Sequence, residues 1–308
     1  MVMISNEFIS QLSSRLGFQL TGFAPAAKLT RETELLTNWI SDGHNAGMGY
    51  MSRNFDKRED VRVLLPSAVS VISLAMNYFP GDFPAPPQDS CKVSRYAWGD
   101  DYHDIIGNKC REMINICKGK DSSFEAVYNV DSGPVMDKSW AVRAGIGWLG
   151  KHTNVINGNS GSWFFLATII CNKEFRYSAA VEDHCGDCTA CIDACPTEAI
   201  IAPYRLNSGK CISYLTIENK NDIPAEFAGK FDNWAFGCDI CQEVCPWNLK
   251  FAEITSEEAY KGNNQYLDRG EINSMDSAQF KTKFINSPVL RPKLKGIQRN
   301  LSFLEKDY

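Results

Sequence analysis

The sequence predicts a mixed α/β domain followed by a smaller, cysteine-rich domain. Apolar runs of helical and strand type alternate over about the first 180 residues, and cysteine motifs then dominate up to about residue 250. The chain has 308 residues, of which 44% are hydrophobic and 22% charged, as is typical of a globular protein with roughly two domains. We place the domains at 1–175 and 176–255, followed by a polar, basic extension at 256–308.

The first part of the α/β domain alternates helices with strands. Residues 8–17 and 32–43 both have apolar side chains at helical spacing and both end at a glycine. Between them, 20–25 has the pattern of a short strand. Residues 67–78 form an apolar run typical of a buried strand, and 81–90 is expected to be irregular because it contains three prolines.

Three further elements complete this domain. Residues 102–119 carry an apolar stripe at helical spacing and predict a helix. The runs 124–130 and 161–170 predict strands, and the first of them ends at Asp131, just before the turn residues Ser-Gly-Pro. From residue 251 onward the chain is polar and gives little sign of another large core.

Composition excludes several classes of protein. The longest strongly apolar run, 163–171, is too short to span a bilayer. The N-terminal stretch MVMISNEFIS lacks the basic and apolar regions of a secretion signal, so we expect a cytoplasmic protein without membrane contact. The net charge of −5 does not attract nucleic acid by itself, so any such contact requires a local basic patch.

The most specific motif is a run of four cysteines. It has the spacing Cys185-x2-Cys188-x2-Cys191-x3-Cys195 and is followed by Pro196. This spacing is typical of bacterial ferredoxins, in which three close thiolates hold one 4Fe–4S cluster and the fourth ligates a second cluster.

A second, incomplete run supplies the partner cluster. Cys238, Cys241 and Cys245 match the last three cysteines of such a run, but Ala235 occupies the first position. Cys211 is the only cysteine between the two runs, so we assign it to the missing position. The first cluster is therefore expected on Cys185, Cys188, Cys191 and Cys245, and the second on Cys195, Cys211, Cys238 and Cys241.

Zinc is the alternative metal, because CxxC pairs also bind zinc. Two zinc ions would leave the protein colourless, whereas two clusters would make it brown and bring about eight irons per chain. The other cysteines lie outside the motifs and are expected to be buried packing residues: Cys91, Cys110, Cys117 and Cys171.

The N-terminal domain has polar residues at predicted strand ends and turns but no familiar cofactor loop. It lacks GxGxxG after a strand, which argues against a dinucleotide fold, and it lacks the CxxxCxxC of radical-SAM proteins. The clusters alone indicate electron transfer, and the large domain before them indicates that the electrons reach a group bound there. The polar stretches are 52–60, 94–103, 130–140 and 145–156, together with 211–218.

In VDSGP, GWLGKHTN, CISYLTIE and the order of the eight spaced cysteines, the chain resembles the epoxyqueuosine reductases over residues 10–300. This resemblance implies a nitroreductase-like cobalamin-binding domain, related to that of reductive dehalogenases, followed by a ferredoxin-like domain with two 4Fe–4S clusters. It also implies that reduced cobalamin removes the epoxide oxygen from epoxyqueuosine in a tRNA anticodon loop. Many family members continue into a helical-repeat domain that contacts tRNA, whereas this chain stops at Tyr308, so that contribution is expected to be absent or replaced.

The resemblance also assigns roles to individual residues. Asp131 of VDSGP is the implied proton donor, and burial against cobalamin and substrate would have to raise its pKa. Asp101 and His103 are further catalytic candidates that would assist proton delivery. The residues implied beside cobalamin are Asn54, Ser94, Asp131, Lys151, Asn154 and Ser213. Each of these residues could instead be an ordinary turn, cap or surface residue.

The resemblance implies two partners. Residues 281–300 carry six lysines or arginines and no acid, so with a tRNA substrate we expect Lys293, Lys295 and Arg299 to bind phosphates, although a solvated face is the alternative. A small flavodoxin or ferredoxin is the expected electron donor, and the enzyme is expected to be a monomer. Because Cys211 and Ser213 are two residues apart, this segment is expected to join the second cluster to the cobalamin pocket.

Two other functions compete with tRNA-linked epoxide reduction. One is cobalamin-dependent reduction of a small molecule, as in the reductive dehalogenases; the basic stretch and the lack of a twin-arginine signal argue against it. The other is a plain iron–sulfur electron carrier. The large N-terminal domain argues against a carrier, and a cobalamin absorption band would exclude it.

Overall fold

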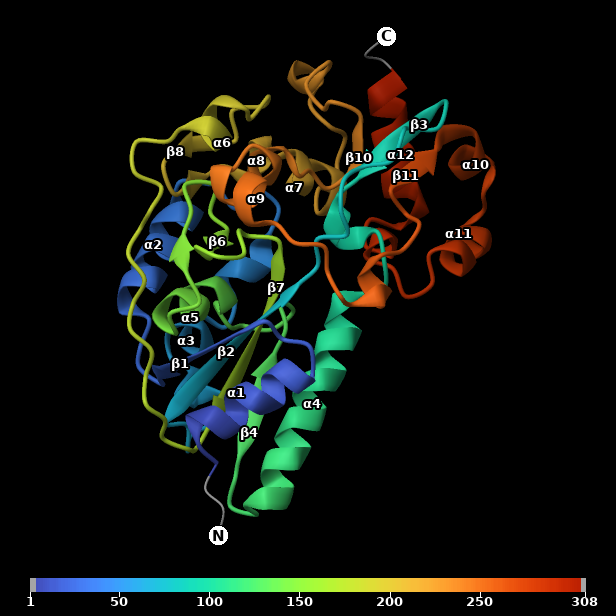
Figure 1. Cartoon of the computed structure of the whole chain (residues 1–308). Coiled ribbons are helices and arrows are strands. Elements are labelled where there is room, and N and C mark those ends of the chain that lie inside the picture. The colour runs from blue at the N-terminus through green and yellow to red at the C-terminus, as the bar shows by residue number, and fades with distance from the viewer. Residues whose placement is uncertain (1–3, 306–308) are drawn as a thin grey trace.

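A four-stranded antiparallel sheet organises the N-terminal half of the chain, of which the computed structural model describes residues 4–305 (Figure 1). The strand order is β1, β2, β7, β4, and every neighbouring pair is antiparallel. The strands are β1 (Leu20–Pro25), β2 (Ser70–Asn77), β7 (Phe164–Cys171) and β4 (Ala126–Asn129). All four strands predicted from the apolar runs are confirmed.

The side chains of β2 alternate between two cores. Ile72 and Leu74 belong to one core, and Val71 belongs to another. Successive residues of a strand point to opposite faces, which is why the run had to be apolar throughout. Helices α1 and α4 pack in the first core and α5 in the second. These helices are α1 (Asn6–Arg15), α4 (Tyr102–Lys120) and α5 (Asp137–Arg143).

Capping side chains set the starts of two of these helices. Ser5 accepts the backbone N–H of Phe8 at 3.2 Å, and Asp101 accepts the backbone N–H of His103 at 3.0 Å. The cap therefore fixes the Asp101 carboxylate beside His103. The predicted helices 8–17, 32–43 and 102–119 are confirmed as α1, α2 (Thr30–Ser41) and α4.

A second sheet joins three segments that are distant in sequence. Strand β3 lies between β10, to which it is parallel, and β11, to which it is antiparallel. Helices α7 and α12 pack against β10, and α12 also packs on α10 and α11. The elements are β3 (Ser90–Val93), β10 (Trp234–Phe236), β11 (Tyr266–Asp268), α7 (Ile212–Ile217), α10 (Arg269–Ser274), α11 (Ser277–Lys283) and α12 (Lys293–Glu305).

This second sheet corrects the expectation of little core after residue 251. Leu294, Ile297 and Leu301 are all buried on one face of α12, in a core shared with β3 and β10. Their spacing is helical, but they are separated by charged and polar residues, so the apolar periodicity was sparse. The Asn300 amide, 1% exposed, donates to the carbonyl oxygens of Thr216 and Ala235 at 2.8 and 2.9 Å and secures α12.

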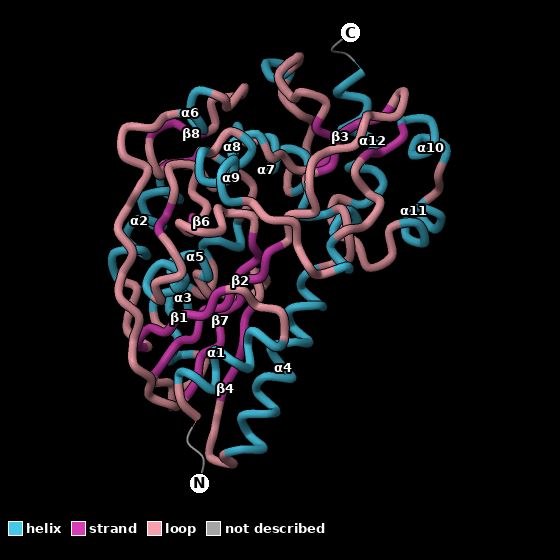
Figure 2. The backbone as a smooth tube through the Cα atoms, in the orientation of Figure 1, coloured by secondary structure: helices cyan, strands magenta, loops and turns pink. Residues whose placement is uncertain are grey.

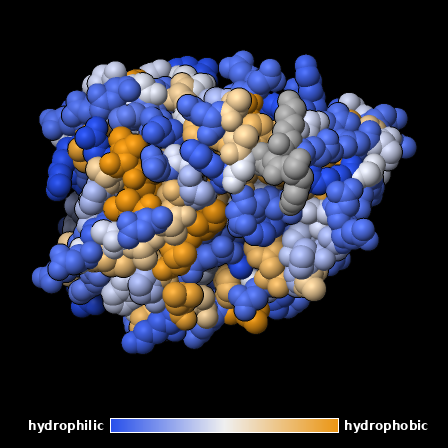
Figure 3. Space-filling view, turned by 90° about the horizontal axis from the view of Figure 1, so that it is seen from above, coloured by the Kyte–Doolittle hydropathy of each residue, from blue (hydrophilic) through white to orange (hydrophobic). Residues whose placement is uncertain are grey.

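Loops dominate the cysteine segment (Figure 2). Short helices α6 and α8 lie within the two cysteine runs and pack against each other. Figure 3 views the molecule from above and shows a band of hydrophobic side chains between hydrophilic ones. The elements of this segment are α6 (Ala190–Asp193), β8 (Ile200–Ala202), β9 (Arg205–Leu206), α8 (Ile240–Glu243) and α9 (Pro246–Phe251).

Short elements make up the rest of the described chain. The remaining helix and strands are α3 (Phe55–Glu59), β5 (Trp148–Leu149) and β6 (Val155–Ile156). The 3-10 turns are Gly49–Ser52, Val61–Val63, Arg95–Ala97, Ser208–Lys210, Ala225–Phe227, Glu258–Tyr260 and Pro288–Leu290. Between residues 4 and 305 no helix is both long and apolar enough to cross a bilayer. The domain limits inferred from composition stay a prediction.

Candidate active site

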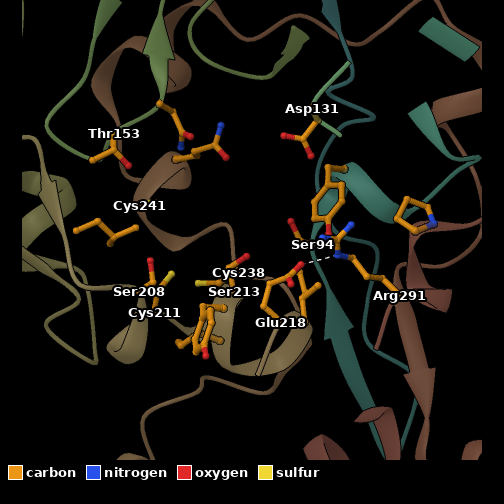
Figure 4. Close-up of a pocket in the computed structure, with 18 of the residues that line it drawn as sticks. Ser94, Asp131, Thr153, Ser208, Cys211, Ser213, Glu218, Cys238, Cys241 and Arg291 are labelled. Atoms are coloured by element: carbon orange, nitrogen blue, oxygen red, sulfur yellow. Dashed lines mark hydrogen bonds and ion pairs between the residues drawn. The ribbon is translucent and has the colours of Figure 1, made fainter. Parts of the chain in front are cut away.

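A cavity of about 850 Å³ lies where the N-terminal sheet, the second sheet and the cysteine segment meet. Its volume is in the upper part of the range found for small-molecule and cofactor sites. Figure 4 shows that Asp131, Ser94, Ser213 and Arg291 surround the same space as three cysteines: Cys211, Cys238 and Cys241. The pocket thus collects side chains from across the whole sequence.

Three of the predicted catalytic residues form one hydrogen-bonded cluster at the pocket. Asp131 follows β4 with a left-handed backbone (φ 54°), and Tyr102 Oη donates to its Oδ2 at 2.8 Å. His103 Nε2 lies 3.6 Å from the same Asp131 oxygen, while His103 Nδ1 lies 2.6 Å from Asp101 Oδ1. One imidazole therefore stands between two carboxylates.

The cluster places its proton on the histidine. Burial lowers the pKa of His103, but hydrogen bonds to Asp101 and Asp131 outweigh burial and raise this pKa to about 9. The His103 hydrogen bond holds the pKa of Asp131 below its ordinary value against the effect of burial. The rise in the pKa of Asp131 that we expected is therefore not seen, because the interactions with His103 and Tyr102 outweigh the effect of burial.

Asp137 is a titratable neighbour that sequence reasoning missed. Burial raises the pKa of this carboxyl group to about 7, and its oxygens accept hydrogen bonds from Thr168 and Asn129. It follows Asp131 by six residues and begins α5, so a second acid close behind VDSGP was the available signal.

The predicted cobalamin contacts divide into two sets. Ser94, Asn154 and Ser213 line the large pocket together with Asp131, and their assignment stays a prediction. Asn54 and Lys151 are not among the residues that line it.

Lys151 requires a correction, because its amine does not face the large pocket. Its Nζ donates to the carbonyl oxygens of Gly186 and Cys188 at 2.5 and 2.9 Å, and the residue is 8% exposed. Lys151 therefore holds the loop of the first cysteine run. Lys138, which the sequence analysis did not single out, lines the large pocket instead and donates to the Asn154 side chain at 2.8 Å.

The eight motif cysteines separate into the two groups predicted from spacing. A cavity of about 310 Å³ is lined by the first group: Cys185, Cys188, Cys191 and Cys245. The large pocket is lined by the second group: Cys195, Cys211, Cys238 and Cys241. Cys91, Cys110, Cys117 and Cys171 are at most 1% exposed, which confirms their packing role.

The surroundings of Cys191 disfavour its ionisation. Burial, with the neighbouring thiols of Cys245, Cys185 and Cys188, raises the pKa of Cys191 to about 11. Thiolates packed this closely in one group therefore require bound positive charge, which iron would supply. Between residues 4 and 305 no three His, Cys, Asp or Glu side chains are grouped closely enough for a single metal ion.

A buried ionic network anchors the loop of the second group. Asp239, between Cys238 and Cys241, is 1% exposed and accepts the Arg95 backbone N–H at 2.9 Å and its guanidinium at 3.1 Å. Ser94 Oγ donates to the same carboxylate. Arg95 also pairs with Glu243 at 2.5 Å. The network joins the pocket residue Ser94 directly to the cysteine loop.

The basic stretch 281–300 has both exposed and internal members. Lys293 and Lys295 are exposed on α12. Arg299 requires a correction, because its guanidinium donates to the carbonyl oxygens of Leu215, Asn219 and Asn221 and so acts as a packing anchor. Arg291, which the sequence analysis did not single out, lines the large pocket and pairs with Glu218 at 2.5 Å (Figure 4).

Comparisons with known families match both halves of this site. A model described as epoxyqueuosine reductase QueG matches residues 58–132, and one described as a 4Fe-4S double cluster binding domain matches 184–248. The epoxyqueuosine reductase of Cellulophaga algicola is 43% identical over 302 residues, covering 97% of this chain and 98% of that protein. The Synechocystis enzyme is 39% identical, covering 91% and 98%.

Solved structures of epoxyqueuosine reductases also match this chain. A crystal structure of epoxyqueuosine reductase with an epoxyqueuosine-modified tRNA-Tyr stem loop has a TM-score of 0.91 and 30% identity, covering 98% of this chain and 80% of that one. The Streptococcus thermophilus enzyme has a TM-score of 0.91 and 28% identity, covering 99% and 82%.

Proposed function

The chain belongs to the epoxyqueuosine reductase family of oxidoreductases, and we propose that it reduces epoxyqueuosine in tRNA to queuosine within the 850 Å³ pocket. One observation carries this proposal. The pocket brings the Asp131–His103–Asp101 cluster together with four cysteines of the double-cluster domain. A reductive step that also consumes protons needs both groups at one place.

The 4Fe–4S double-cluster domain supplies the electron path. We assign the two clusters to the two cysteine groups, because each group surrounds its own cavity. Cys188 is the exposed cysteine of the first group, which suits entry of electrons from an external one-electron carrier such as a flavodoxin or ferredoxin. The second group then passes electrons to the large pocket.

The large pocket is also the proposed cobalamin site. Its size and its hydroxyl and amide side chains suit a large, amide-bearing cofactor, and Ser94, Asn154 and Ser213 would hold it. Bound there, reduced cobalamin supplies the strong reductant that no side chain provides. Cys211 and Ser213 are separated by a single residue at the start of α7. One short segment therefore connects the second cysteine group with this site.

The chain's own side chains manage the protons. Conversion of the epoxide to the alkene consumes two electrons and two protons and releases one water. His103 carries a proton near neutral pH and lies 3.6 Å from Asp131, whose carboxylate faces the pocket. His103 can therefore pass its proton to Asp131, which relays it to the leaving oxygen, while Asp101 holds the imidazole in place.

We place the tRNA backbone along the start of α12. Arg291 lines the pocket, and Lys293 and Lys295 follow it at exposed positions. Lysine and arginine side chains bind backbone phosphates regardless of sequence. The modified base would thus enter the pocket while its flanking phosphates contact these lysines.

Anaerobic reconstitution tests the proposal. The chain is loaded with iron, sulfide and cobalamin, and iron, sulfide and corrin are counted before turnover is measured on epoxyqueuosine-bearing tRNA. We expect about eight irons, one corrin and conversion to queuosine. A protein that holds the clusters but binds no corrin, or that binds both without converting the tRNA, would refute the assignment.

A further inference from the structure

Trp148 is clamped beside the cavity of the first cysteine group. It lies on β5, is 2% exposed, and packs edge-on against the rings of Trp247 and His184 at 5.0 and 5.1 Å. Interplanar angles of 76° and 80° fix the plane of the indole from two sides. The direction of its N–H bond is therefore set by packing.

The indole N–H of Trp148 has no hydrogen-bond partner among residues 4–305, although it is fully buried. A buried donor without an acceptor is unfavourable, and native proteins rarely tolerate one unless a redox group, ion or water completes it. The hydrophobic cluster that contains this side chain also contains Cys245, and Cys185 packs against the cluster. Their sulfur atoms can accept a hydrogen bond.

Of the two thiols, that of Cys185 interacts with the Trp148 side chain.

Another buried indole provides the contrast. The Trp140 N–H is also unpartnered in the described chain, but Trp140 lies in a core on the far side of the N-terminal sheet that contains no cysteine. An unpaired buried indole is therefore not peculiar to the cysteine cavity, but an unpaired indole packed on two motif cysteines is a feature of Trp148.

We propose that the Trp148 indole donates a hydrogen bond to the ligand sulfur of Cys185 and thereby raises the reduction potential of the first 4Fe–4S cluster. The inference rests on the cluster assignment in the proposed function. Reduction adds negative charge to the cluster, so a donor to its sulfur stabilises the reduced state more than the oxidised state. Trp148 is a tuning residue for electron entry and takes no part in the epoxide chemistry.

The test is Trp148→Phe in the full reconstituted chain, with Trp140→Phe as the matched control. Phe keeps one aromatic ring at this position and removes the N–H together with part of the indole, and Trp140→Phe removes the same atoms elsewhere in the protein. Iron is counted, and each cluster potential is followed by EPR during a redox titration. The first cluster is identified as the signal that persists in Cys211→Ala. We expect Trp148→Phe to keep the parent iron content and shift the first cluster alone to a more negative potential.

A second measurement does not depend on how the variant folds. Electron–nuclear double resonance of the parent protein in H2O and D2O should show an exchangeable proton coupled to the first cluster, and Trp148→Phe should lose that coupling.

The outcomes distinguish a failure of the proposed Trp148 hydrogen bond from a failure of the cluster assignment. Retained iron with an unchanged potential overturns the inference alone. If Trp148→Phe loses iron, the parent protein decides the question. The inference is overturned if no exchangeable proton is coupled to the first cluster, and it is supported if such a proton is assigned to an indole nitrogen. A parent chain that takes up no iron overturns the cluster assignment and the inference together.

Discussion

The two cysteine groups have the same ligand chemistry but opposite surroundings. The first borders a cavity of about 310 Å³ and includes Cys188, which is exposed. The second lines the 850 Å³ pocket together with Asp131 and Ser213. Cys191 of the first group acts electrostatically on Cys241 of the second, so the groups adjoin. In the proposed function, this difference gives the electron path a direction, from solvent through the first group to the second and then to the pocket.

Their supports differ as well. The first group is held by the Lys151 amine, which bonds two loop carbonyls, and by aromatic rings packed edge-on. The second is held by the buried Arg95–Asp239 pair. A lysine on carbonyl oxygens leaves the loop close to solvent, whereas a buried ion pair fixes the loop to the pocket wall. The following experiments test this contrast.

Removing one ligand from each group should produce the largest difference. We expect Cys211→Ala to abolish turnover with any reductant, because the cluster beside the pocket is lost. Cys188→Ala should abolish turnover with a protein electron donor but keep part of it with a small chemical reductant that bypasses the first cluster. Each variant should retain about four irons. Equal loss with both reductants would contradict the proposed order of the two groups.

Asp131→Asn tests the substrate side of the second group. We expect turnover to fall about 10²–10⁴-fold, the usual contribution of general acid catalysis, while iron, corrin and reduction of the corrin stay at parental levels. Asp104→Asn is the control, because Asp104 also lines the pocket but is not among the residues hydrogen-bonded to Asp131. Near-normal turnover by Asp131→Asn would remove this residue from the mechanism.

Arg95→Met tests the anchor of the second group. Removing one partner of a buried ion pair typically costs about 3–5 kcal/mol, because Asp239 then keeps an uncompensated buried charge. Thermal unfolding should show this loss, and the second cluster should be lost before the first. Lys151→Met, at the first group, should reverse that order of cluster loss. If both variants lose the same cluster first, the two supports are not specific to their groups.

The acid–base cluster predicts a pH dependence. The folded pKa of His103 is about 9, above the unfolded value of 6.5. Its contribution to stability is therefore complete below pH 6.5 and is lost as the pH rises towards 9. Single-turnover rates should fall as the pH rises through about 9, where His103 of the folded protein loses its proton. In His103→Gln this alkaline fall in the rate should be absent. If the fall persists, another group causes it.

The smallest effect is expected from substitutions at the proposed tRNA-binding surface of the protein. Replacing both Lys293 and Lys295 by Ala should weaken tRNA binding modestly and reduce the slope of log K against log salt by about one for each lysine. Arg299→Ala should instead lower the melting temperature with little change in that slope, because its guanidinium bonds three carbonyl groups. An unchanged slope in the double lysine variant would remove α12 from the interface.

Sequence predicted those features that depend on local spacing. The seven predicted helices and strands and the division of eight cysteines into two groups are all present, because periodicity and ligand spacing are carried by neighbouring residues. The core behind α12 was missed because its apolar residues are sparse within any one segment and gather only when α12 meets β10.

The side-chain partners could not be predicted from spacing. Lys151 bonds a loop 35 residues ahead, and Arg95 bonds Asp239, 144 residues ahead. The position of the proton, on His103 and not on Asp131, was missed for the same reason. The pKa of Asp131 depends on His103 and Tyr102, which belong to α4.

The second sheet has a consequence for biosynthesis. Its central strand, β3, leaves the ribosome early, but its neighbours end at residues 236 and 268, and the pocket also needs Arg291. A nascent chain therefore completes the pocket only when almost all of it has been synthesised. Contacts between such distant segments form slowly. Loading with oxygen-sensitive cofactors is thus a late, post-translational event, and an interrupted translation product would contain the first cysteine run without its partner.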